Sequence, residues 1–351
     1  MISKDTRDFL FYHNTMVALL QGDDFRKKIH DAYLTQIIDS GLANRKPATK
    51  NNKELRLILT QNCNYQCFFC HKEGIKEKSE DKLTVEDYVY LYNACKDEFG
   101  WQTVSLSGGE PLLYKNLGEL ISGIAEQKGE ITIVSNGELL DKYMDTVKKL
   151  KQINLSLHSL DPKTYEKITG HPTLSKVISN IDMVKKEAPH VDLRLNMVLN
   201  KGLNDSVNDI RDFVKFAGEK DCSAKFIELS GKGHVPNADV FNTLESLGAK
   251  YKNSSPRGVN FLHGETRISL MRCACDHARK GLSPSIDCAD TSSIIIGSSG
   301  NMIMCTRTGE HASLLDDIKN KNTQELVSKI GKLNSAFGGR KCIFVDNKTN
   351  L

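Results

Sequence analysis

The sequence predicts an α/β fold built around a partial (β/α)6 barrel, and the main evidence is a regular alternation that starts at Glu54. Short apolar segments with strand character alternate there with longer amphipathic segments of helical period. Because a helix separates each pair of strands, we expect parallel strands joined by right-handed crossovers. The expected strands are 55–59, 103–106, 131–134, 153–157, 191–198 and 224–229, and the expected helices lie near 84–98, 115–127, 138–149, 174–187 and 205–217.

Two further segments flank this barrel. Residues 1–53 carry two apolar stripes of helical period and predict an N-terminal helical extension. After residue 235, glycine and proline end the alternation, and the segments 292–296 and 302–304 around a glycine-containing turn predict a β-hairpin. Helices are expected near 238–249, 312–319 and 322–332, so we divide the chain into 1–53, 54–235 and a small C-terminal domain, 236–351.

The composition is that of a soluble globular protein, except for its cysteines. Of 351 residues, 39% are apolar and 26% charged, and the net charge of +4 comes without a long Lys/Arg run, so no DNA partner is expected. The apolar stretches are of strand length and no signal peptide opens the sequence; we expect no membrane partner and a cytoplasmic location. Ten cysteines in a reducing compartment indicate a metal, a cluster or catalysis rather than disulfides.

Three of these cysteines, Cys63, Cys67 and Cys70, lie within eight residues just after the first expected strand. Three thiolates on one loop can bind three irons of a 4Fe–4S cluster and leave the fourth iron open for a ligand. A zinc site is the alternative, but it needs a fourth Cys or His at knuckle spacing, and only His71 is adjacent. A purely structural role for such close thiols is the weakest interpretation.

Polar and glycine-rich stretches follow the next three strands, at the end where parallel barrels carry their active sites. The glycine pair of the first stretch lets the backbone approach a ligand, and its glutamate can accept from an ammonium group. The short side chains of the other two suit carboxylate and ribose hydroxyls. The expected cofactor-binding residues are Gly108, Gly109, Glu110, Pro111, Ser135, Asn136, Ser156 and Ser159.

The Cys-x3-Cys-x2-Cys loop, with Phe69 before its last cysteine, and the following Gly-Gly-Glu-Pro stretch resemble the radical S-adenosylmethionine (SAM) superfamily over residues 54–230. The resemblance implies a 4Fe–4S cluster on Cys63, Cys67 and Cys70 whose open iron binds the methionyl group of SAM. It also implies reductive cleavage of SAM to methionine and a 5′-deoxyadenosyl radical, which abstracts a substrate hydrogen. A flavodoxin- or ferredoxin-type reductant is then an expected partner.

Within the barrel, stretches such as 67–74 and 154–161 are similar to the molybdenum-cofactor GTP 3′,8-cyclases. That similarity implies that Ser135 and Ser156 contact SAM and places Arg194 where the family has a phosphate-binding lysine. The expected substrate is therefore a small polar molecule, a nucleotide or sugar derivative. The candidate catalytic residues are His158, Arg194, Lys225 and Glu228. Each also has a purely structural alternative: hydrogen bonding for His158, a salt bridge for Arg194, and closure of the sheet edge for Lys225 and Glu228.

The C-terminal half departs from the cyclase pattern, because Cys288 is followed by Ser293-Ile294-Ile295-Ile296 without an arginine before Cys305. Its spacing resembles instead the opening of the SPASM or twitch domains, which implies a second, auxiliary 4Fe–4S cluster. Cys342 is the candidate third ligand, and Cys273 or Cys275 the fourth. A peptide-modifying enzyme, a GTP 3′,8-cyclase and a non-enzymatic iron–sulfur or zinc scaffold remain the alternatives, and Cys95 and Cys222 are expected to be small buried residues.

Overall fold

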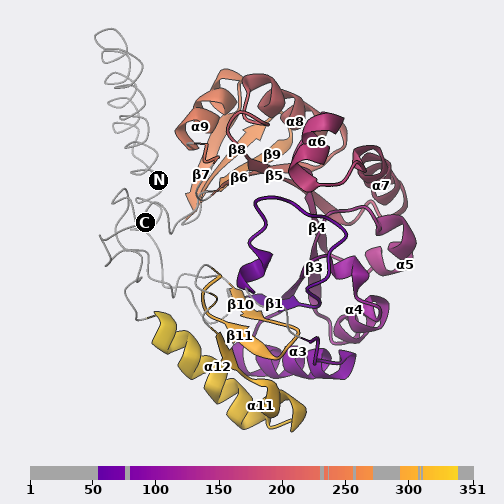
Figure 1. The fold of residues 1–351 in the computed structure, drawn as a ribbon, viewed down its shortest axis with the longest axis vertical. Coiled ribbons are helices and arrows are strands. Elements are labelled where there is room, and N and C mark those ends of the chain that lie inside the picture. Colours follow the sequence, from indigo (N-terminus) through magenta and orange to yellow (C-terminus); the bar gives the residue numbers. More distant parts are fainter. Residues whose placement is uncertain are drawn as a thin grey trace.

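The computed structural model describes residues 54–75, 80–229, 233–235, 237–255, 258–271, 293–306, 309 and 311–338. Its centre is one sheet of twelve strands in the order β12-β11-β10-β1-β2-β3-β4-β5-β6-β9-β8-β7. The sheet curves around an open centre and the helices lie on its outside (Figure 1). The predicted helical extension at residues 1–53 lies outside the described residues.

Six parallel strands in sequential order form the barrel and confirm the predicted fold class. The strands are β1 (Glu54–Ile58), β2 (Thr103–Ser107), β3 (Glu130–Ser135), β4 (Gln152–Ser156), β5 (Asp192–Leu199) and β6 (Ser223–Glu228). The connecting helices are α3 (Val85–Phe99), α4 (Leu117–Glu126), α5 (Met144–Val147), α6 (Pro162–Thr169), α7 (Leu174–Glu187) and α8 (Val207–Glu219). The 3-10 turns are η2 (Lys72–Gly74), η3 (Pro111–Leu113) and η4 (Leu140–Tyr143).

Side-chain alternation along the strands explains the two surfaces of the sheet. In β5, Leu193, Leu195 and Met197 are at most 1% exposed, whereas Asp192 and Arg194, on either side of Leu193, are partly exposed. Successive strand residues point to opposite faces, so the apolar set packs beneath the helices and the polar set faces the concave side. The barrel interior is therefore lined by the polar half of each strand.

The sequence did not predict two helical details. Helix α6 begins where the Asp161 side chain accepts a hydrogen bond from Thr164 N, with Pro162 in its first turn. It is a single short helix inside a connection that already contains α7, so the alternation did not require it. The helix expected at 138–149 is divided into η4 and α5.

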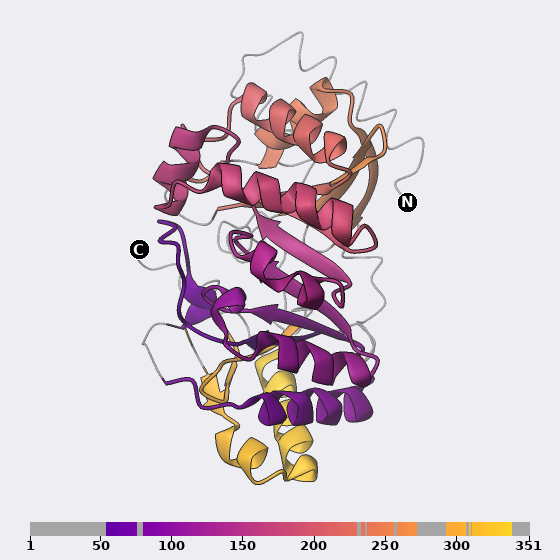
Figure 2. The same cartoon turned by 90° about the vertical axis from the view of Figure 1, so that its right-hand side faces the viewer.

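The segments after residue 236 extend the sheet at both of its edges (Figure 2). Strand β9 (Thr266–Met271) is parallel to β6, and β8 (Gly258–His263) and β7 (Lys250–Ser255) follow it as antiparallel neighbours. At the other edge β10 (Ser293–Ile296) is parallel to β1, and β11 (Asn301–Ile303) and β12 (His311–Ser313) continue outward. The remaining helices are α9 (Asn237–Ser246), α11 (Leu315–Lys319) and α12 (Thr323–Gly338).

The predicted hairpin is confirmed as β10 and β11, whereas strands β7, β8 and β9 were not predicted from the sequence. Of these three strands β7 is the one at the edge of the sheet, and its Lys, Asn and Ser residues are typical of a polar linker. The division between residues 235 and 236 stays a prediction, and the described segments on either side of it share one sheet. None of the described helices has the length and apolarity needed to cross a membrane.

Candidate active site

The three-cysteine loop leaves β1 at the carboxyl end of the barrel strands. Cys63 and Cys70 are exposed and Cys67 is half-buried. The Tyr65 N–H donates to Cys63 Sγ and the Lys72 N–H donates to Cys70 Sγ, each at 3.4 Å. Backbone N–H groups directed at cysteine sulfur are what iron–sulfur sites use to balance thiolate charge. The loop therefore presents suitable donors for a cluster.

The environment of this loop disfavours ionisation of the Cys67 and Cys63 thiols. Burial, then the neighbouring Cys70 and Cys63, raise the pKa of Cys67 to about 12. Burial also raises the pKa of Cys63, while hydrogen bonds from Tyr65 N and the Asn136 side chain oppose that rise. Thiolates crowded in this way are stabilised by bound iron cations. Within the described residues no three Cys, His, Asp or Glu side chains are grouped as a single metal ion requires.

Gly108 and Gly109 bring the loop after β2 against the cysteine loop, and their expected role in cofactor binding stays a prediction. Gly109 N donates to Thr60 O and Glu110 N donates to Asn62 O, both at 2.8 Å. A Cβ on Gly109 would collide with the Asn62 carbonyl, and one on Gly108 would lie 2.6 Å from Thr60 O. The missing side chains let the loop after β2 pack directly against the start of the cysteine loop.

The far side of the cysteine loop is held by the end of α6. Gln66 N donates to Thr169 O at 2.9 Å, and Phe68 N donates to Ile168 O at 3.3 Å. These carbonyls belong to the last turn of the helix, where no intrahelical partner is available to them. The cysteine loop is thus fixed between the loop after β2 and the carboxyl end of α6.

Glu110 is 1% exposed, and both of its carboxylate oxygens are engaged. One oxygen accepts from Ser135 Oγ at 2.8 Å and from Leu112 N at 3.1 Å, and the other accepts from Asn136 N at 2.8 Å. Burial raises the pKa of Glu110 to about 7, against the lowering effect of these hydrogen bonds. In this structure Glu110 joins the ends of β2 and β3, and the buried Pro111 opens the turn η3 beside it.

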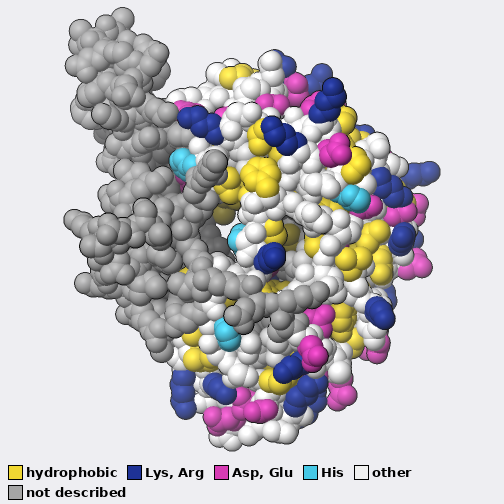
Figure 3. Space-filling model, viewed as in Figure 1, with side chains coloured by type: hydrophobic (Ala, Val, Ile, Leu, Met, Phe, Trp, Pro, Cys, Tyr) yellow, Lys and Arg dark blue, Asp and Glu magenta, His cyan; other side chains and the backbone are white. Residues whose placement is uncertain are grey.

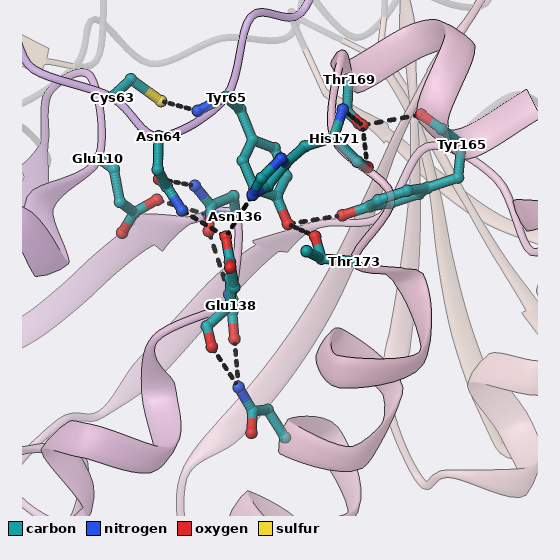
Figure 4. A network of polar contacts seen from close by, with 12 residues as sticks. Cys63, Asn64, Tyr65, Glu110, Asn136, Glu138, Tyr165, Thr169, His171 and Thr173 are labelled. Carbon is teal, nitrogen blue, oxygen red and sulfur yellow. Dashed lines mark hydrogen bonds and ion pairs between the residues drawn. The ribbon is translucent and has the colours of Figure 1, made fainter.

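Asn136 turns its side chain toward the cysteine loop, as Figure 4 shows. Its Nδ2 donates to Asn64 Oδ1 at 2.8 Å, and its Oδ1 accepts from Glu138 N at 3.1 Å. Glu138 in turn accepts from Asn64 Nδ2 and lies 3.4 Å from His171 Nε2. Asn64, Glu138 and His171 were not predicted from the sequence, although the position of Asn64 inside the cysteine motif indicates a role near the cluster.

The end of β4 places His158 and Ser159 in structural contacts. The His158 side chain is buried, its Nδ1 accepts from Val198 N at 3.2 Å, and its ring lies edge-on to Phe69 with centroids 4.9 Å apart. Burial lowers the pKa of His158 to about 4, so the ring is neutral at pH 7 and serves as a hydrogen-bond acceptor. Ser159 Oγ accepts from Asp161 N at 3.0 Å, and Ser156 is partly exposed at the end of β4.

Arg194 and Lys225 lie on the inner face of the barrel. Lys225 is in register with Asn196 of β5, which is in register with Ser156, the last residue of β4. Lys225 is therefore closer to the carboxyl end than Arg194, which pairs with Asn154 and Ser223 one row below. Burial lowers the pKa of Arg194, and acidic Asp192 and Glu54 oppose that change.

Two polar atoms on the same inner face have no hydrogen-bond partner among the described residues, namely Asn196 Oδ1 and Ser223 Oγ. Each of these residues is only 7% exposed. Buried polar groups are normally paired, and an unpaired one in an open barrel suits a bound ligand. Figure 3 shows the hollow at the centre of this face of the molecule.

Glu228 lies on the opposite face of β6 from Lys225, because strand residues alternate. It is 5% exposed, and its carboxylate lies 2.6 Å from His234 Nε2 and 3.5 Å from Asn237 Nδ2. Of the two candidates on this strand, Lys225 faces the interior and Glu228 fixes the connection to α9.

Among the remaining cysteines, Cys305 follows β11, and its neighbour Thr306 packs against Gly74, four residues beyond Cys70. Cys95 and Cys222 are buried, as predicted. The other candidate ligands of a second cluster, Cys273, Cys275, Cys288 and Cys342, lie outside the described residues.

Comparison with known proteins identifies the family. The model of the Radical SAM superfamily matches residues 57–217, a range that contains all three cysteines of the loop. A probable GTP 3′,8-cyclase of Sulfolobus acidocaldarius is 38% identical over 221 residues, which cover 58% of this chain and 69% of that protein. The chain belongs to the radical SAM superfamily.

Two further matches extend this radical SAM assignment. A probable GTP 3′,8-cyclase of Pyrobaculum aerophilum is 27% identical over 78% of this chain and 90% of that protein. The crystal structure of Streptococcus suis SuiB bound to its precursor peptide SuiA has a TM-score of 0.57 at 19% identity. The match covers 77% of this chain and 65% of SuiB. At this low identity, and over less than two thirds of SuiB, it supports the fold alone.

As a radical SAM enzyme, the chain uses a 4Fe–4S cluster and SAM. Its described residues fit the cluster, because three thiols lie on one loop, backbone N–H groups donate to Cys63 and Cys70, and burial together with the neighbouring thiols raises the pKa of Cys67. Cys63, Cys67 and Cys70 would hold three irons, and the loops after β2, β3 and β4 surround the same end of the barrel.

Proposed function

We propose that this radical SAM enzyme abstracts a hydrogen from a small anionic substrate, a nucleotide or sugar derivative, bound inside the barrel. One observation carries the proposal, namely the inner face that combines Arg194 and Lys225 with unpartnered atoms of Asn196 and Ser223. Two cations beside two unfilled hydrogen-bonding groups suit a phosphate or carboxylate next to hydroxyl groups.

The reactive chemistry comes from the cofactors, and the protein holds and shields them. When bound and reduced by one electron, the cluster and SAM supply a 5′-deoxyadenosyl radical. Cys63, Cys67 and Cys70 bind the iron, and a flavodoxin- or ferredoxin-type protein delivers the electron. Neutral His158 keeps the β4 and β5 ends together through Val198 N and adds no charge to the interior.

GTP is the first nucleotide to test, since the curated relatives are named GTP 3′,8-cyclases. The absence of arginine between Cys288 and Cys305 separates this chain from the cyclase pattern, so other nucleotides and nucleotide sugars belong in the same assay. We also propose an auxiliary cluster that includes Cys288 and Cys305, with Cys342 and either Cys273 or Cys275 as further ligands. Its support is the hairpin of β10 and β11, which ends next to Cys305.

The substrate is tested by anaerobic assay of the reconstituted enzyme with SAM, a reductant and each candidate in turn. The expected result is 5′-deoxyadenosine above the level without substrate for at least one nucleotide or nucleotide sugar. Lys225→Met should lower this substrate-dependent rate by at least about tenfold, the loss expected from one buried charged hydrogen bond. Lys215→Met on the exposed face of α8 is the matched control and should keep it. No response to any phosphorylated candidate would overturn the proposal.

The cofactors are tested separately by iron analysis. We expect about eight irons per chain with both clusters and about four in the Cys63→Ser, Cys67→Ser, Cys70→Ser variant, which should not cleave SAM. About four irons in the unaltered chain would reject the auxiliary cluster. Zinc without iron would reject the whole assignment in favour of a scaffold.

A further inference from the structure

Asn136 lies where the loops after β1, β2 and β3 meet. Its backbone N–H donates to Glu110, and its side-chain Oδ1 accepts from Glu138 N, so the amide plane is fixed by the protein. The remaining side-chain group, Nδ2, donates to Asn64 Oδ1 at 2.8 Å. Asn136 is only 7% exposed and presents its amide to the cysteine loop (Figure 4).

Asn64 is the residue directly after Cys63, and it is held from two sides. Its Oδ1 accepts from Asn136, while its Nδ2 donates to Glu138 Oε2. The next peptide N–H, that of Tyr65, donates to Cys63 Sγ at 3.4 Å. Fixing the Asn64 side chain therefore fixes the peptide that points at the Cys63 sulfur.

The other end of this peptide is also anchored. The Tyr65 hydroxyl contacts Thr173 Oγ1 at 2.5 Å and accepts from the Tyr165 hydroxyl at 3.1 Å. The segment from Cys63 to Tyr65 is thus tied to the loop after β3 through Asn64 and to the α6–α7 region through Tyr65. Neither tie contributes a group to the barrel interior.

We propose that Asn136 is a positioning residue for the iron–sulfur cluster rather than a contact for SAM. It acts on the Cys63 sulfur through its own side-chain hydrogen bond and, by way of Asn64, through the Tyr65 N–H, and both contacts raise the reduction potential of the cluster. The physical basis is that hydrogen bonds to cluster sulfur offset negative charge and stabilise the reduced form. This inference rests on the cluster assigned to Cys63, Cys67 and Cys70.

The test is a redox titration of the reconstituted enzyme followed by electron paramagnetic resonance, with iron content measured on the same samples. Asn136→Ala removes the tie, and Asn136→Asp also adds a negative charge, so the midpoint potential should fall in the order wild type, Asn136→Ala, Asn136→Asp. At a fixed potential, we expect the ratio of reduced to oxidised cluster to fall on the order of tenfold. This corresponds to a midpoint potential that is lower by about 59 mV for one electron. Asn320→Asp, the same change at an exposed position, should leave the potential unchanged.

A double variant tests whether Asn136 acts through Asn64. Asn64→Ala should lower the potential by itself and by less than Asn136→Ala, and the Asn64→Ala, Asn136→Ala variant should fall no further than Asn136→Ala alone. Should Asn136→Ala lose its fold, the partly exposed Asn64 carries the test. Full iron content with wild-type potentials in Asn136→Asp and Asn64→Ala would overturn the inference. Absence of a cluster from the wild-type enzyme would instead overturn the cofactor assignment.

Discussion

Glu110, in the Gly-Gly-Glu-Pro stretch, holds neighbouring strand ends together through its hydrogen bonds. Its buried carboxylate accepts from Ser135, Asn136 and Leu112 and so joins the ends of two strands. Burial nevertheless outweighs these hydrogen bonds and raises the pKa from 4.5 to about 7. Near neutral pH the group is divided between its charged and neutral forms, which links its protonation to the stability of the fold.

We predict that Glu110 lowers the stability of the protein as the pH rises. Its pKa in the folded chain lies above that in the unfolded chain, so the folded state binds the proton more tightly and stability falls between about pH 4.5 and about pH 7. The fall amounts to about 3 kcal/mol at 1.36 kcal/mol per pKa unit. Glu110→Gln cannot lose a proton, so its free energy of unfolding should lack this component.

Anaerobic urea unfolding at pH 5 and pH 8 measures the difference. The gap between wild type and Glu110→Gln should change by about 3 kcal/mol between the two pH values, to the disadvantage of the wild type at pH 8. Glu187→Gln, at an exposed position of α7, is the control and should follow the wild type. Parallel wild-type and Glu110→Gln stabilities across this range would contradict the prediction.

At the scale of elements, the contact between the loops after β1 and β2 depends on Gly109. We predict that Gly109→Ala separates these loops, because the new Cβ would collide with the Asn62 carbonyl, and backbone cannot turn aside as a side chain can. The variant should lose about 1–3 kcal/mol of stability and more than half of its iron. Iron analysis and thermal unfolding measure the two effects.

Gly331 provides the matched control for this change. A Cβ there meets no atom within 4 Å, and the residue lies inside α12. Gly331→Ala should therefore gain about 0.5–1 kcal/mol, since alanine loses less backbone entropy in a helix. Wild-type iron content in Gly109→Ala would show that the two loops can move apart without cost to the cluster site.

The barrel elements were predictable because each of them carries a local signal. Buried parallel strands such as β5 read as apolar alternation, and the segment predicted at 174–187 is α7 itself. Strands β7, β8 and β9 escaped prediction for two reasons. The edge strand β7 is polar, and the pairing of β9 with β6 joins segments separated by a helix and two strands, so it has no local signature in the sequence. A strand can be recognised from the sequence when its own residues alternate in polarity. It is missed when it depends on pairing with a strand that is distant along the chain.

The sequence predicted where along the chain the site residues lie, but not toward which neighbours their side chains point. The spacing of Cys63, Cys67 and Cys70 placed the cluster loop, and strand alternation separates Lys225 from Glu228. The turn of Asn136 toward Asn64 was not predictable, because it depends on a contact between residues 72 positions apart. Roles that rest on such long-range contacts need the fold before they can be assigned.

At the scale of the whole molecule, the C-terminal segment supports the strand from which the cysteine loop departs. Strand β10 pairs with β1, and α11 and α12 pack against α3 beside it. The link is Asp87, whose carboxylate lies 2.5 Å from Lys319 Nζ and 3.0 Å from Lys321 Nζ. Although burial raises it, hydrogen bonds from Lys319, Thr84 and Lys321 hold the pKa of Asp87 well below its usual range.

We predict that Asp87→Asn weakens the attachment of this whole C-terminal segment. The asparagine can still accept from Thr84 N, but it removes the charge partner of Lys319 and leaves Lys321 with the longer, 3.8 Å contact to Glu86. The cost should be about 1–3 kcal/mol, given that the lysines are partly exposed. Because Asp87 is ionised in the fold well below neutral pH, the loss should be complete at pH 7 and shrink as the wild type is acidified through its own low pKa.

Hydrogen exchange measures this effect along the chain. In Asp87→Asn, amides of β10, β11, α11 and α12 should lose protection together, since they open as one cooperative unit, while β4, β5 and β6 keep theirs. Asp212→Asn, which breaks an exposed ion pair with Arg211, is the control and should change neither group. An equal fall in protection in all strands would contradict the prediction, because the C-terminal segment would then open only together with the barrel. Loss of protection confined to the C-terminal segment would show that this segment can detach while the barrel stays folded, and that it supports β1 and, through β1, the loop of Cys63.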